Sequence, residues 1–391
     1  MNILELIDTY YPVVDGAIGV VKNYADELSK VASVCLAVPK ASKKSNYVDN
    51  ESFKVLRCCS ASASEGYRNA LPFLDCKFKR EINKEDFDIL HAHSPFSLGR
   101  FAIKTGRKKQ VPVVATLHTK YHQDFERVLG KDSTLVDFMI DYIMKVFNKA
   151  DSVWTVSYAS RQTLIDYGYK GEIDVVRNGT SYTYPDNPEE LIERVNKLHN
   201  LYAEENVFIF VGRMAMYKGL KTIVDALSIV KNAGKQFKML FVGGGFDFDT
   251  LKNYVAEKGI EKDCILTGQV SDKELIKGYY LRSDALLFPS TFDMASLTKV
   301  EASAHKKPSV VVRGSCSAEG VIDNENGFLC DNNAESFAKK IIELCDNKEI
   351  VKKIGENAYK TLYWNWEDVA KEVLEKYKFI IEKYKIDHKL K

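Results

Sequence analysis

The sequence predicts an α/β protein with two doubly wound parallel sheets, one in each half of the chain. Short apolar runs alternate with helical segments, the alternation stops once in a turn-rich stretch at 178–188, and then it begins again. Apolar runs with helices on both sides are typical of parallel strands buried on both faces. A chain of 391 residues has room for two such domains.

In the first half, the apolar runs predict strands and the segments between them predict helices. The strands are expected at 3–7, 34–38, 54–56, 89–92, 113–117 and 152–156. The helices are expected at 19–28, 98–105, 133–148 and 159–167. Because crossovers between parallel strands are right-handed, these elements should form one doubly wound sheet.

The second half opens with a polar helix at 189–200 and repeats the pattern. Its strands are expected at 207–211, 239–242, 264–267, 285–288 and 309–312. Its helices are expected at 221–232, 248–258, 273–281 and 299–304. We therefore expect an N-terminal domain at 1–184, a C-terminal domain at 185–365, and an amphipathic segment at 366–391 that crosses back to the first domain. The cleft between the halves is the expected ligand site.

Composition limits the classes of protein. The chain is 45% hydrophobic and 28% charged, which excludes a disordered or coiled-coil chain. Lys and Arg number 56 against 54 Asp and Glu, so no basic field favours nucleic acid. A signal peptide begins with a basic segment and continues with an apolar one, whereas this N-terminus has no basic segment and soon reaches Glu5. No apolar run approaches the length of a membrane span. Eight cysteines without a C-x-x-C pair indicate a reducing, cytoplasmic compartment and no zinc site.

Two glycine-bearing loops follow predicted strands. One is the turn at 12–19, which includes Gly16, and the other is Gly243 with the two glycines after it. Glycine lets backbone N–H groups approach an anion closely, above all at the N-terminus of a helix. Both loops are equally well explained as tight turns, so at this point both interpretations stand.

Two cations follow the first strand of the second half. Arg213 and Lys218 flank a loop at the carboxyl end of that strand, where open α/β sheets bind ligands. A guanidinium and an ammonium together suit a diphosphate. The alternative is a pair of solvated surface cations, and the position after a buried strand favours the ligand.

Two carboxylates stand around a later junction of strand and helix. Asp293 falls in the loop, and Glu301 falls in a helix that should begin at about Ser296. The backbone N–H groups near Ser296 and Leu297 are then free to face an anion. By itself, a glutamate such as Glu301 is more often an exposed helix residue.

Histidines lie past two strands of the first half. His118 follows the strand at 113–117, where it could orient a substrate oxygen. His91 and His93 end the preceding strand, and with His118 and His122 they offer a conceivable metal set. No spacing among them defines a metal geometry, so no metal and no cofactor is predicted.

Together these features resemble family 4 of the retaining glycosyltransferases, which have the two-Rossmann-domain architecture called GT-B. The bacterial glycolipid and cell-envelope branch of that family is the most similar. The resemblance covers nearly the whole chain, in the expected order. It rests on the turn from Pro12 to Gly16, Gly212-Arg213 with Lys218-Gly219, Asp293-x7-Glu301, 174–179, 308–311, 318–320, 326–328 and His118-Thr119-x-Tyr121.

The resemblance implies a nucleotide-sugar donor held mainly by the C-terminal domain, retention at the anomeric carbon, and no metal. The expected catalytic residues are His118, Arg213, Lys218 and Asp293. The expected donor-binding residues are Gly16, Gly243, Ser296, Leu297 and Glu301. Where this family usually has Glu, this chain has Asp293, which bears on the identity of the sugar. Asp-x-Asp strings occur at 86–88 and 247–249, and such a string is typical of a metal-dependent, single-domain transferase. The doubled sheet argues against that class of enzyme. Asp247 is instead expected at the N-cap of a helix, where an aspartate accepts backbone N–H bonds.

Partners follow from the same resemblance. We expect a UDP- or GDP-sugar donor and a lipid, glycolipid or polysaccharide acceptor. The alternatives are a sugar-nucleotide epimerase of the same fold and a non-catalytic nucleotide-sugar-binding partner subunit. A lipid acceptor would bring peripheral contact with the inner face of the cell membrane. The residues considered for that contact are a basic cluster, Lys104, Arg107, Lys108 and Lys109, and the apolar side chains of a nearby helix, Phe138, Ile140, Ile143, Met144 and Phe147. The alternative interpretation is that the cluster is a solvated turn and that the helix faces the core.

Overall fold

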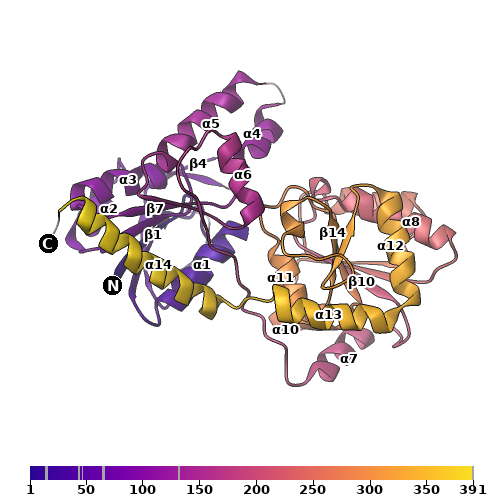
Figure 1. Ribbon diagram of the computed structural model, residues 1–391. Coiled ribbons are helices and arrows are strands. Elements are labelled where there is room, and N and C mark those ends of the chain that lie inside the picture. Colours follow the sequence, from indigo (N-terminus) through magenta and orange to yellow (C-terminus); the bar gives the residue numbers. More distant parts are fainter. Residues whose placement is uncertain (14–15, 43–44, 46, 64–66, 131–132, 390–391) are drawn as a thin grey trace. The chain divides into compact units, whose positions relative to one another are not determined.

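The computed structural model describes residues 1–13, 16–42, 45, 47–63, 67–130 and 133–389. The chain divides into two compact units (Figure 1). Unit 1 comprises Met1–Asn178 and Trp366–Lys391, and unit 2 comprises Gly179–Asn365. Residues 179–184, which the sequence analysis assigned to the first domain, therefore belong to unit 2. Each unit contains one large parallel sheet, which confirms the α/β class.

The sheet of unit 1 has the order β3-β2-β1-β6-β7-β8-β9, and its paired strands are parallel. Its strands are β1 (Asn2–Leu6), β2 (Ser33–Pro39), β3 (Lys54–Cys58), β6 (Ile89–Ala92), β7 (Val113–Leu117), β8 (Ser152–Thr155) and β9 (Asp174–Val175). The strand order reverses direction between β1 and β6. The carboxyl ends of these two strands are the topological switch point, where such sheets bind ligands.

The helices of unit 1 include two that the sequence analysis did not predict. They are α2 (Cys76–Lys84) and α4 (Tyr121–Leu129), and a small antiparallel pair, β4 (Ser60–Ser62) with β5 (Arg68–Ala70), was also missed. The apolar signal of α2 is weak, because the helix buries only Phe78 and Ile82. The other helices are α1 (Gly16–Leu28), α3 (Ser97–Lys109), α5 (Thr134–Phe147), α6 (Tyr158–Asp166) and α14 (Trp366–Asp387).

Helix α14 is the C-terminal helix of the chain, and it packs on unit 1. It lies alongside α1 and the strands of that unit, although it is encoded last (Figure 1). The ring of Trp366 meets the ring of Tyr24 edge-on at 5.5 Å, and Tyr377 stacks on Trp154 at 5.5 Å. Apolar burial of one face therefore anchors α14, and Tyr377 is fully buried.

The loop after β6 is held by a buried carboxylate. Asp8 follows β1, and its Oδ1 accepts a hydrogen bond at 2.9 Å from the backbone N–H of Leu98 in the first turn of α3. The Ser94 hydroxyl donates to Asp8 Oδ2 at 2.7 Å. Burial raises the pKa of Asp8 to about 6. These bonds tie the switch point of unit 1 to the N-terminus of α3.

Unit 2 repeats the architecture with the order β12-β11-β10-β13-β14-β15. Its strands are β10 (Val207–Val211), β11 (Lys238–Val242), β12 (Cys264–Gly268), β13 (Ala285–Phe288), β14 (Ser309–Val312) and β15 (Phe328–Cys330). Its helices are α7 (Pro188–His199), α8 (Leu220–Asn232), α9 (Phe248–Glu257), α10 (Lys273–Arg282), α11 (Leu297–Ala304), α12 (Ala334–Asp346) and α13 (Lys348–Leu362), with 3-10 turns at Met216–Lys218 and Cys316–Ala318. The switch point lies between β10 and β13.

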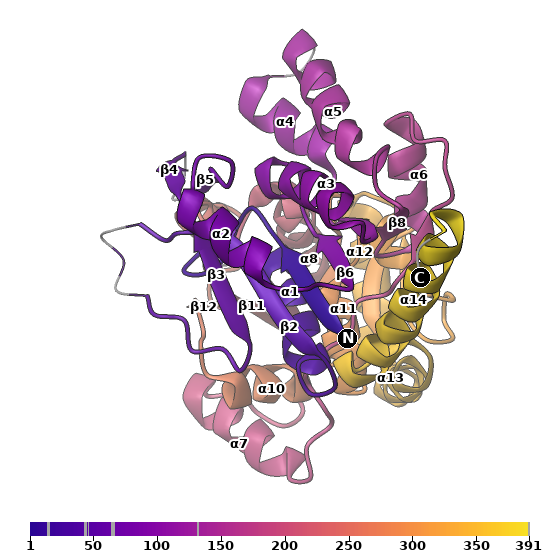
Figure 2. The same ribbon diagram turned by 90° about the vertical axis from the view of Figure 1, so that its left-hand side faces the viewer.

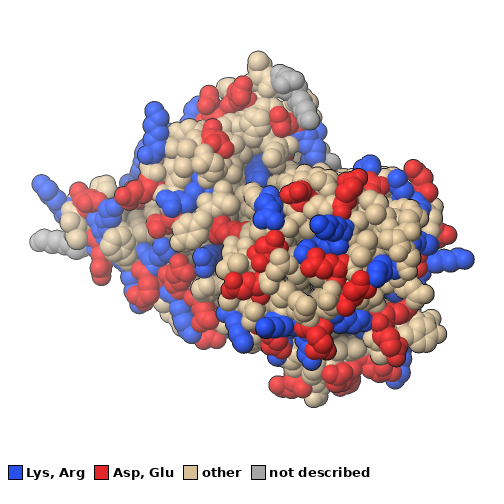
Figure 3. Space-filling view, turned by 45° about the vertical axis from the view of Figure 1, so that its right-hand side comes forward, with Lys and Arg blue, Asp and Glu red and all other residues tan. Residues whose placement is uncertain are grey.

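The sequence analysis assigned no element between 313 and 365, where the structure has β15, α12 and α13. The signal was present, since α12 buries Phe337, Ala338, Ile341 and Leu344 at helical spacing. On the face that Figure 3 shows, basic and acidic side chains are interspersed, as the net charge of +2 leads one to expect. Within the described residues, no helix combines the length and apolar character needed to cross a membrane.

Candidate functional site

Two predicted site residues meet at the switch point of unit 2. Lys218 ends the 3-10 turn after β10, and Asp293 lies in the loop after β13. The Lys218 ammonium donates to Asp293 Oδ1 at 2.6 Å. These loops meet because the carboxyl ends of adjacent parallel strands lie at the same edge of a sheet. The side chains retain 16% and 21% of their exposure, so the pair remains accessible.

A serine holds the other oxygen of this carboxylate. The hydroxyl of buried Ser290 donates to Asp293 Oδ2 at 2.5 Å. Asp293 therefore accepts one hydrogen bond at each oxygen, and its orientation is determined by its partners. Lys218 has three N–H donors, of which this pairing uses one. The arrangement presents a positioned cation, with further donors, at the edge of the sheet.

Glycines allow the loops around this pair to pack closely. A Cβ on Gly219, which has φ +81°, would lie 2.9 Å from the carbonyl oxygen of Pro289. A Cβ on Gly243, at φ +135°, would lie 2.1 Å from the carbonyl oxygen of Gly212. The close approach of two backbones therefore accounts for Gly243 without a ligand. The donor-binding role expected for it stays a prediction.

Arg213 and Asp247 belong to the same loop cluster. Arg213 lies half-buried in the loop directly after β10. Asp247 is the N-cap residue of α9, as predicted, but its side chain makes no capping bond to that helix, so the expected bond is wrong. Its Oδ2 instead accepts a hydrogen bond from the backbone N–H of Met216 at 2.8 Å. The carboxylate therefore supports the turn that carries Lys218.

Helix α11 begins where the sequence predicted. Ser296 is its N-cap, and the serine hydroxyl accepts a hydrogen bond from the backbone N–H of Lys299 at 3.1 Å. Leu297 is the first helical residue. The first N–H groups of a helix have no acceptor within the helix and carry partial positive charge. Helix α11 follows the loop that contains Asp293, and the N-terminus of this helix favours an anion.

Glu301, on α11, has a partner that the sequence analysis missed. The hydroxyl of Tyr280, on α10, donates to Glu301 Oε2 at 2.7 Å. Burial raises the pKa of Glu301, while the bond from Tyr280 lowers it. Tyr280 is buried, and its ring lies parallel to the ring of His305 at 5.1 Å. A tyrosine in a helical pattern gave no signal beyond that of a core residue.

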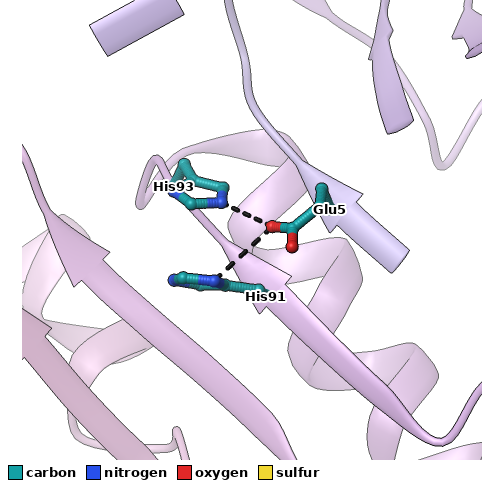
Figure 4. Close-up of side chains that lie close together, drawn as sticks. All are labelled: Glu5, His91 and His93. Atoms are coloured by element: carbon teal, nitrogen blue, oxygen red, sulfur yellow. Dashed lines mark hydrogen bonds and ion pairs between the residues drawn. The ribbon is translucent and has the colours of Figure 1, made fainter. Parts of the chain in front are cut away.

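In unit 1, His118 follows β7 and contacts a buried histidine. His118 Nε2 lies 2.9 Å from His93 Nδ1, and His93 Nε2 lies 2.5 Å from Glu5 Oε2. Glu5 lies on β1, His91 lies on β6, and His93 directly follows β6. The side chains of both histidines point toward Glu5 (Figure 4). Glu5, His91 and His93 are fully buried or nearly so, whereas His118 is half-buried. Burial lowers the pKa of His118 well below 6.5.

Strand register explains why these residues meet. Glu5 pairs with His91, and His91 pairs with Val114. Alternate residues of a strand lie on one face, so His93 follows His91 and Thr116 follows Val114 on the same face. His91 Nε2 lies 2.6 Å from the Thr116 hydroxyl, and His91 Nδ1 lies 2.5 Å from the Tyr377 hydroxyl. The cluster thus joins three adjacent strands to α14.

The structure brings together a different set of possible metal ligands from the four histidines considered in the sequence analysis. The ligand atoms of Glu5, His91 and His93 lie within 4.8 Å of one another, a spacing that suits a metal ion. These atoms already make hydrogen bonds within unit 1. His122 lies on α4, with its Nδ1 3.6 Å from Glu126.

Two further predictions concern the outer parts of unit 1. Gly16 is the exposed first residue of α1, and a Cβ there would meet open space, while residues 14–15 of its turn lie outside the described residues. Phe138 is 62% exposed on α5. The other four apolar residues considered for membrane contact are not available for it, and the alternative of a core-facing helix is confirmed for them: Ile140, Ile143, Met144 and Phe147 are buried.

Two family models match the chain. The model described as Glycosyltransferase Family 4 matches residues 14–183, and the model described as Glycosyl transferases group 1 matches residues 192–361. The chain is 25% identical over 378 residues to an alpha-monoglucosyldiacylglycerol synthase of Acholeplasma laidlawii, covering 92% of each chain. It is 25% identical over 339 residues to the synthase of the same name from Streptococcus pneumoniae, covering 83% of this chain and 74% of the other.

Solved structures share the fold. HepE of Anabaena, crystallised with UDP, has a TM-score of 0.78 at 18% identity, covering 96% of this chain and 99% of that one. Sucrose-phosphate synthase of Thermosynechococcus elongatus has a TM-score of 0.80 at 18% identity, covering 97% and 99%. The two family models and the named synthases, rather than the shared fold, support a transferase over the epimerase and the non-catalytic subunit. Because the two family models match the two halves in order, the chain belongs to the family 4 glycosyltransferases, with the GT-B fold and a similarity to the bacterial glycolipid enzymes.

Proposed function

We propose that this glycosyltransferase moves a hexosyl group from a nucleotide sugar to a lipid, glycolipid or polysaccharide acceptor, with retention at the anomeric carbon and without a metal ion. UDP-glucose and a diacylglycerol are the favoured pair. Relatives are named as monoglucosyldiacylglycerol synthases, and HepE has been crystallised with UDP-glucose. The observation that carries the proposal is the Lys218–Asp293 ion pair at the switch point of unit 2.

The chemistry requires charge stabilisation. The bond between the anomeric carbon and the diphosphate breaks, a bond to the acceptor oxygen forms on the same face, and the acceptor proton passes to a phosphate oxygen. Negative charge grows on the leaving group, so fixed cations that bind it more tightly in the transition state lower the barrier. Lys218 and Arg213 supply those cations, and Asp293 and Ser290 keep Lys218 in place.

The remaining roles follow from position. Glu301, as a carboxylate, accepts hydrogen bonds from the ribose hydroxyls of the nucleotide. The backbone N–H groups at Ser296 and Leu297 bind a phosphate at the N-terminus of α11. For unit 1, the family resemblance assigns a contact with the transferred sugar to His118 and a contact with the donor phosphate to Gly16.

The test is a transfer assay with radiolabelled UDP-glucose and diacylglycerol in mixed micelles. Replacing Lys218 by Ala removes one cation from the leaving group, so kcat/KM should fall by about 100-fold to 1000-fold. The matched control is Lys221→Ala, because Lys221 is an exposed lysine that pairs with Asp225 on α8. It should stay within about twofold of wild type.

Three results would contradict the proposal. They are wild-type kcat/KM in Lys218→Ala, inversion at the anomeric carbon of the product, and loss of transfer on adding a chelator. A thermal-shift screen of UDP- and GDP-sugars identifies the donor base, because a ligand that binds the native state raises its apparent stability.

A lipid acceptor implies a surface that meets the membrane, and we place the protein in the cytoplasm at the inner face. Helices α4 and α5 project beyond the sheet of unit 1 (Figure 2). They carry four exposed apolar side chains, Val128, Leu129, Leu135 and Phe138. Grouped exposed apolar residues are typical of interaction surfaces.

Vesicle co-sedimentation tests this surface. The double variant Leu135→Ser/Phe138→Ser removes two of its apolar side chains and should bind anionic vesicles at least about fivefold more weakly. The control is Phe379→Ser/Ile386→Ser, which removes two exposed apolar residues from α14 (65% and 76% exposed) and should bind as wild type. Equal loss in both variants would show that the surface is not specific to α4 and α5.

A further inference from the structure

The buried carboxylate on β1 has no part in the proposed transfer, yet it is linked to His118 through one histidine. Glu5 Oε2 lies 2.5 Å from His93 Nε2, and His93 Nδ1 lies 2.9 Å from His118 Nε2. Of the three side chains, only His118 is accessible to a substrate. Glu5 and His93 therefore form a line of hydrogen bonds that ends at His118, the side chain that a substrate can reach.

The direction of the hydrogen bonds follows from the partners of Glu5. The Tyr377 hydroxyl donates to Glu5 Oε1 at 3.0 Å, and burial raises the pKa of Tyr377 well above 10, so this hydroxyl keeps its proton. A carboxylate only accepts hydrogen bonds, so His93 must donate to it from Nε2. When the ring of His93 is neutral and donates from Nε2, its lone pair lies at Nδ1. His118 must donate to that lone pair from Nε2.

We propose that Glu5 and His93 are positioning residues that hold His118 as the Nε2–H tautomer and keep its Nδ1 as a hydrogen-bond acceptor for a substrate hydroxyl. The tautomer of a histidine is determined by the bond that its other nitrogen makes. His118 accordingly receives a proton-bearing hydroxyl, from the sugar or the acceptor, and does not donate to a phosphate oxygen. The contact with substrate rests on the proposed function, whereas the tautomer does not.

The rest of the cluster agrees with this assignment. Tyr377 donates its proton to Glu5, so it accepts from His91 Nδ1, 2.5 Å away. His91 Nε2 then accepts from the Thr116 hydroxyl at 2.6 Å. Burial lowers the pKa of His91 well below 6.5, which agrees with a neutral ring. Each polar atom of this chain of bonds thus has one consistent role.

The first measurement needs no substrate. Long-range proton–nitrogen correlation spectra of protein labelled with nitrogen-15 histidine distinguish protonated from unprotonated ring nitrogens, and a His118→Gln spectrum assigns the signals. His118 is expected with protonated Nε2 and unprotonated Nδ1. A protonated Nδ1 in the wild type overturns the proposal.

The second measurement uses two replacements of His93. His93→Asn keeps an acceptor at the position of Nδ1, whereas His93→Leu removes it. We expect His93→Leu to lose the Nε2–H tautomer and to lower kcat by about 10-fold to 100-fold at nearly constant donor KM. His93→Asn should keep the tautomer and most of the rate. If both variants fall equally, His93 is only a structural residue and the proposal fails.

Thr116→Val is the matched control. It removes a hydrogen bond from the same buried cluster but leaves the bonds from Glu5 to His118 intact. It should change neither the tautomer nor kcat, and an effect equal to that of His93→Leu would overturn the proposal. The two claims fail separately. A different tautomer with transfer intact overturns the positioning role, and the stated tautomer without transfer in the wild type overturns the proposed function.

Discussion

At the scale of residues, the structure pairs each of three site residues with a specific neighbour. Asp293 holds Lys218, Tyr280 donates to Glu301, and His93 contacts His118. The sequence analysis named the second member of each pair, because those residues lie in loops after strands or in the helix that follows such a loop. It also named Asp293 and His93, but not as the partners of Lys218 and His118. The pairs themselves were not predictable, since their members come from different elements.

Tyr280 provides a prediction at this scale. Burial raises the pKa of Glu301, and the Tyr280 hydroxyl opposes that rise. In Tyr280→Phe the pKa should therefore rise further. If the ionised carboxylate binds the ribose, UDP affinity falls as the pH drops through this pKa, and in the variant the fall begins at higher pH.

Calorimetric titration with UDP between about pH 5 and pH 8 measures the change in the pH at which UDP affinity begins to fall. Tyr279→Phe is the control, because the Tyr279 hydroxyl bonds His199 and not Glu301. The same profile in all three proteins would show that Glu301 does not bind the nucleotide in its ionised form.

At the scale of elements, glycine decides how two loops of unit 2 pack. Gly243, after β11, lies against the backbone of Gly212, after β10. The sequence indicated a close backbone approach at Gly243 but left open what approached it. A single chain segment does not specify its neighbour, so a ligand and a second loop produce the same pattern.

Gly243→Ala should therefore destabilise unit 2. The new Cβ would meet the Gly212 carbonyl at 2.1 Å and sit at φ +135°. Together, strain and clash should cost about 3 kcal/mol. Gly234→Ala is the control, since Gly234 also has a positive φ, +77°, but has open space at its Cβ, and it should cost about 1 kcal/mol. Denaturant unfolding compares the two, and equal losses would show that the contact with Gly212 contributes nothing.

At the scale of the whole molecule, the chain forms two units and three segments. The last segment, with α14, completes unit 1 by covering its sheet and by placing Tyr377 beside Glu5. The amphipathic pattern of this helix was visible in the sequence. The surface that it covers depends on a sheet formed by residues far away in the chain.

Val373→Asp tests that dependence. Val373 is fully buried on α14, so a carboxylate there should destabilise unit 1 by at least about 3 kcal/mol. Hydrogen exchange should then lose protection in 1–178, with protection in 179–365 retained. Phe379→Asp, at a 65% exposed position of the same helix, should leave both units protected. Equal loss of protection in the two units would show that they do not unfold separately.

The sequence alone was enough to establish the two parallel sheets, the loops that follow β10 and β13, and the start of α11 at Ser296. These features depend on local periodicity and on the capping chemistry of single residues, which a chain displays along its length. Only the tertiary structure decided the partners of the site residues. Glu5 and Tyr377 stand 372 positions apart, and Glu5 looked like one polar residue in an apolar strand. A hydrogen bond across such a separation leaves no periodic signal, because it forms only when the register of the sheet and the packing of α14 bring both groups to one face.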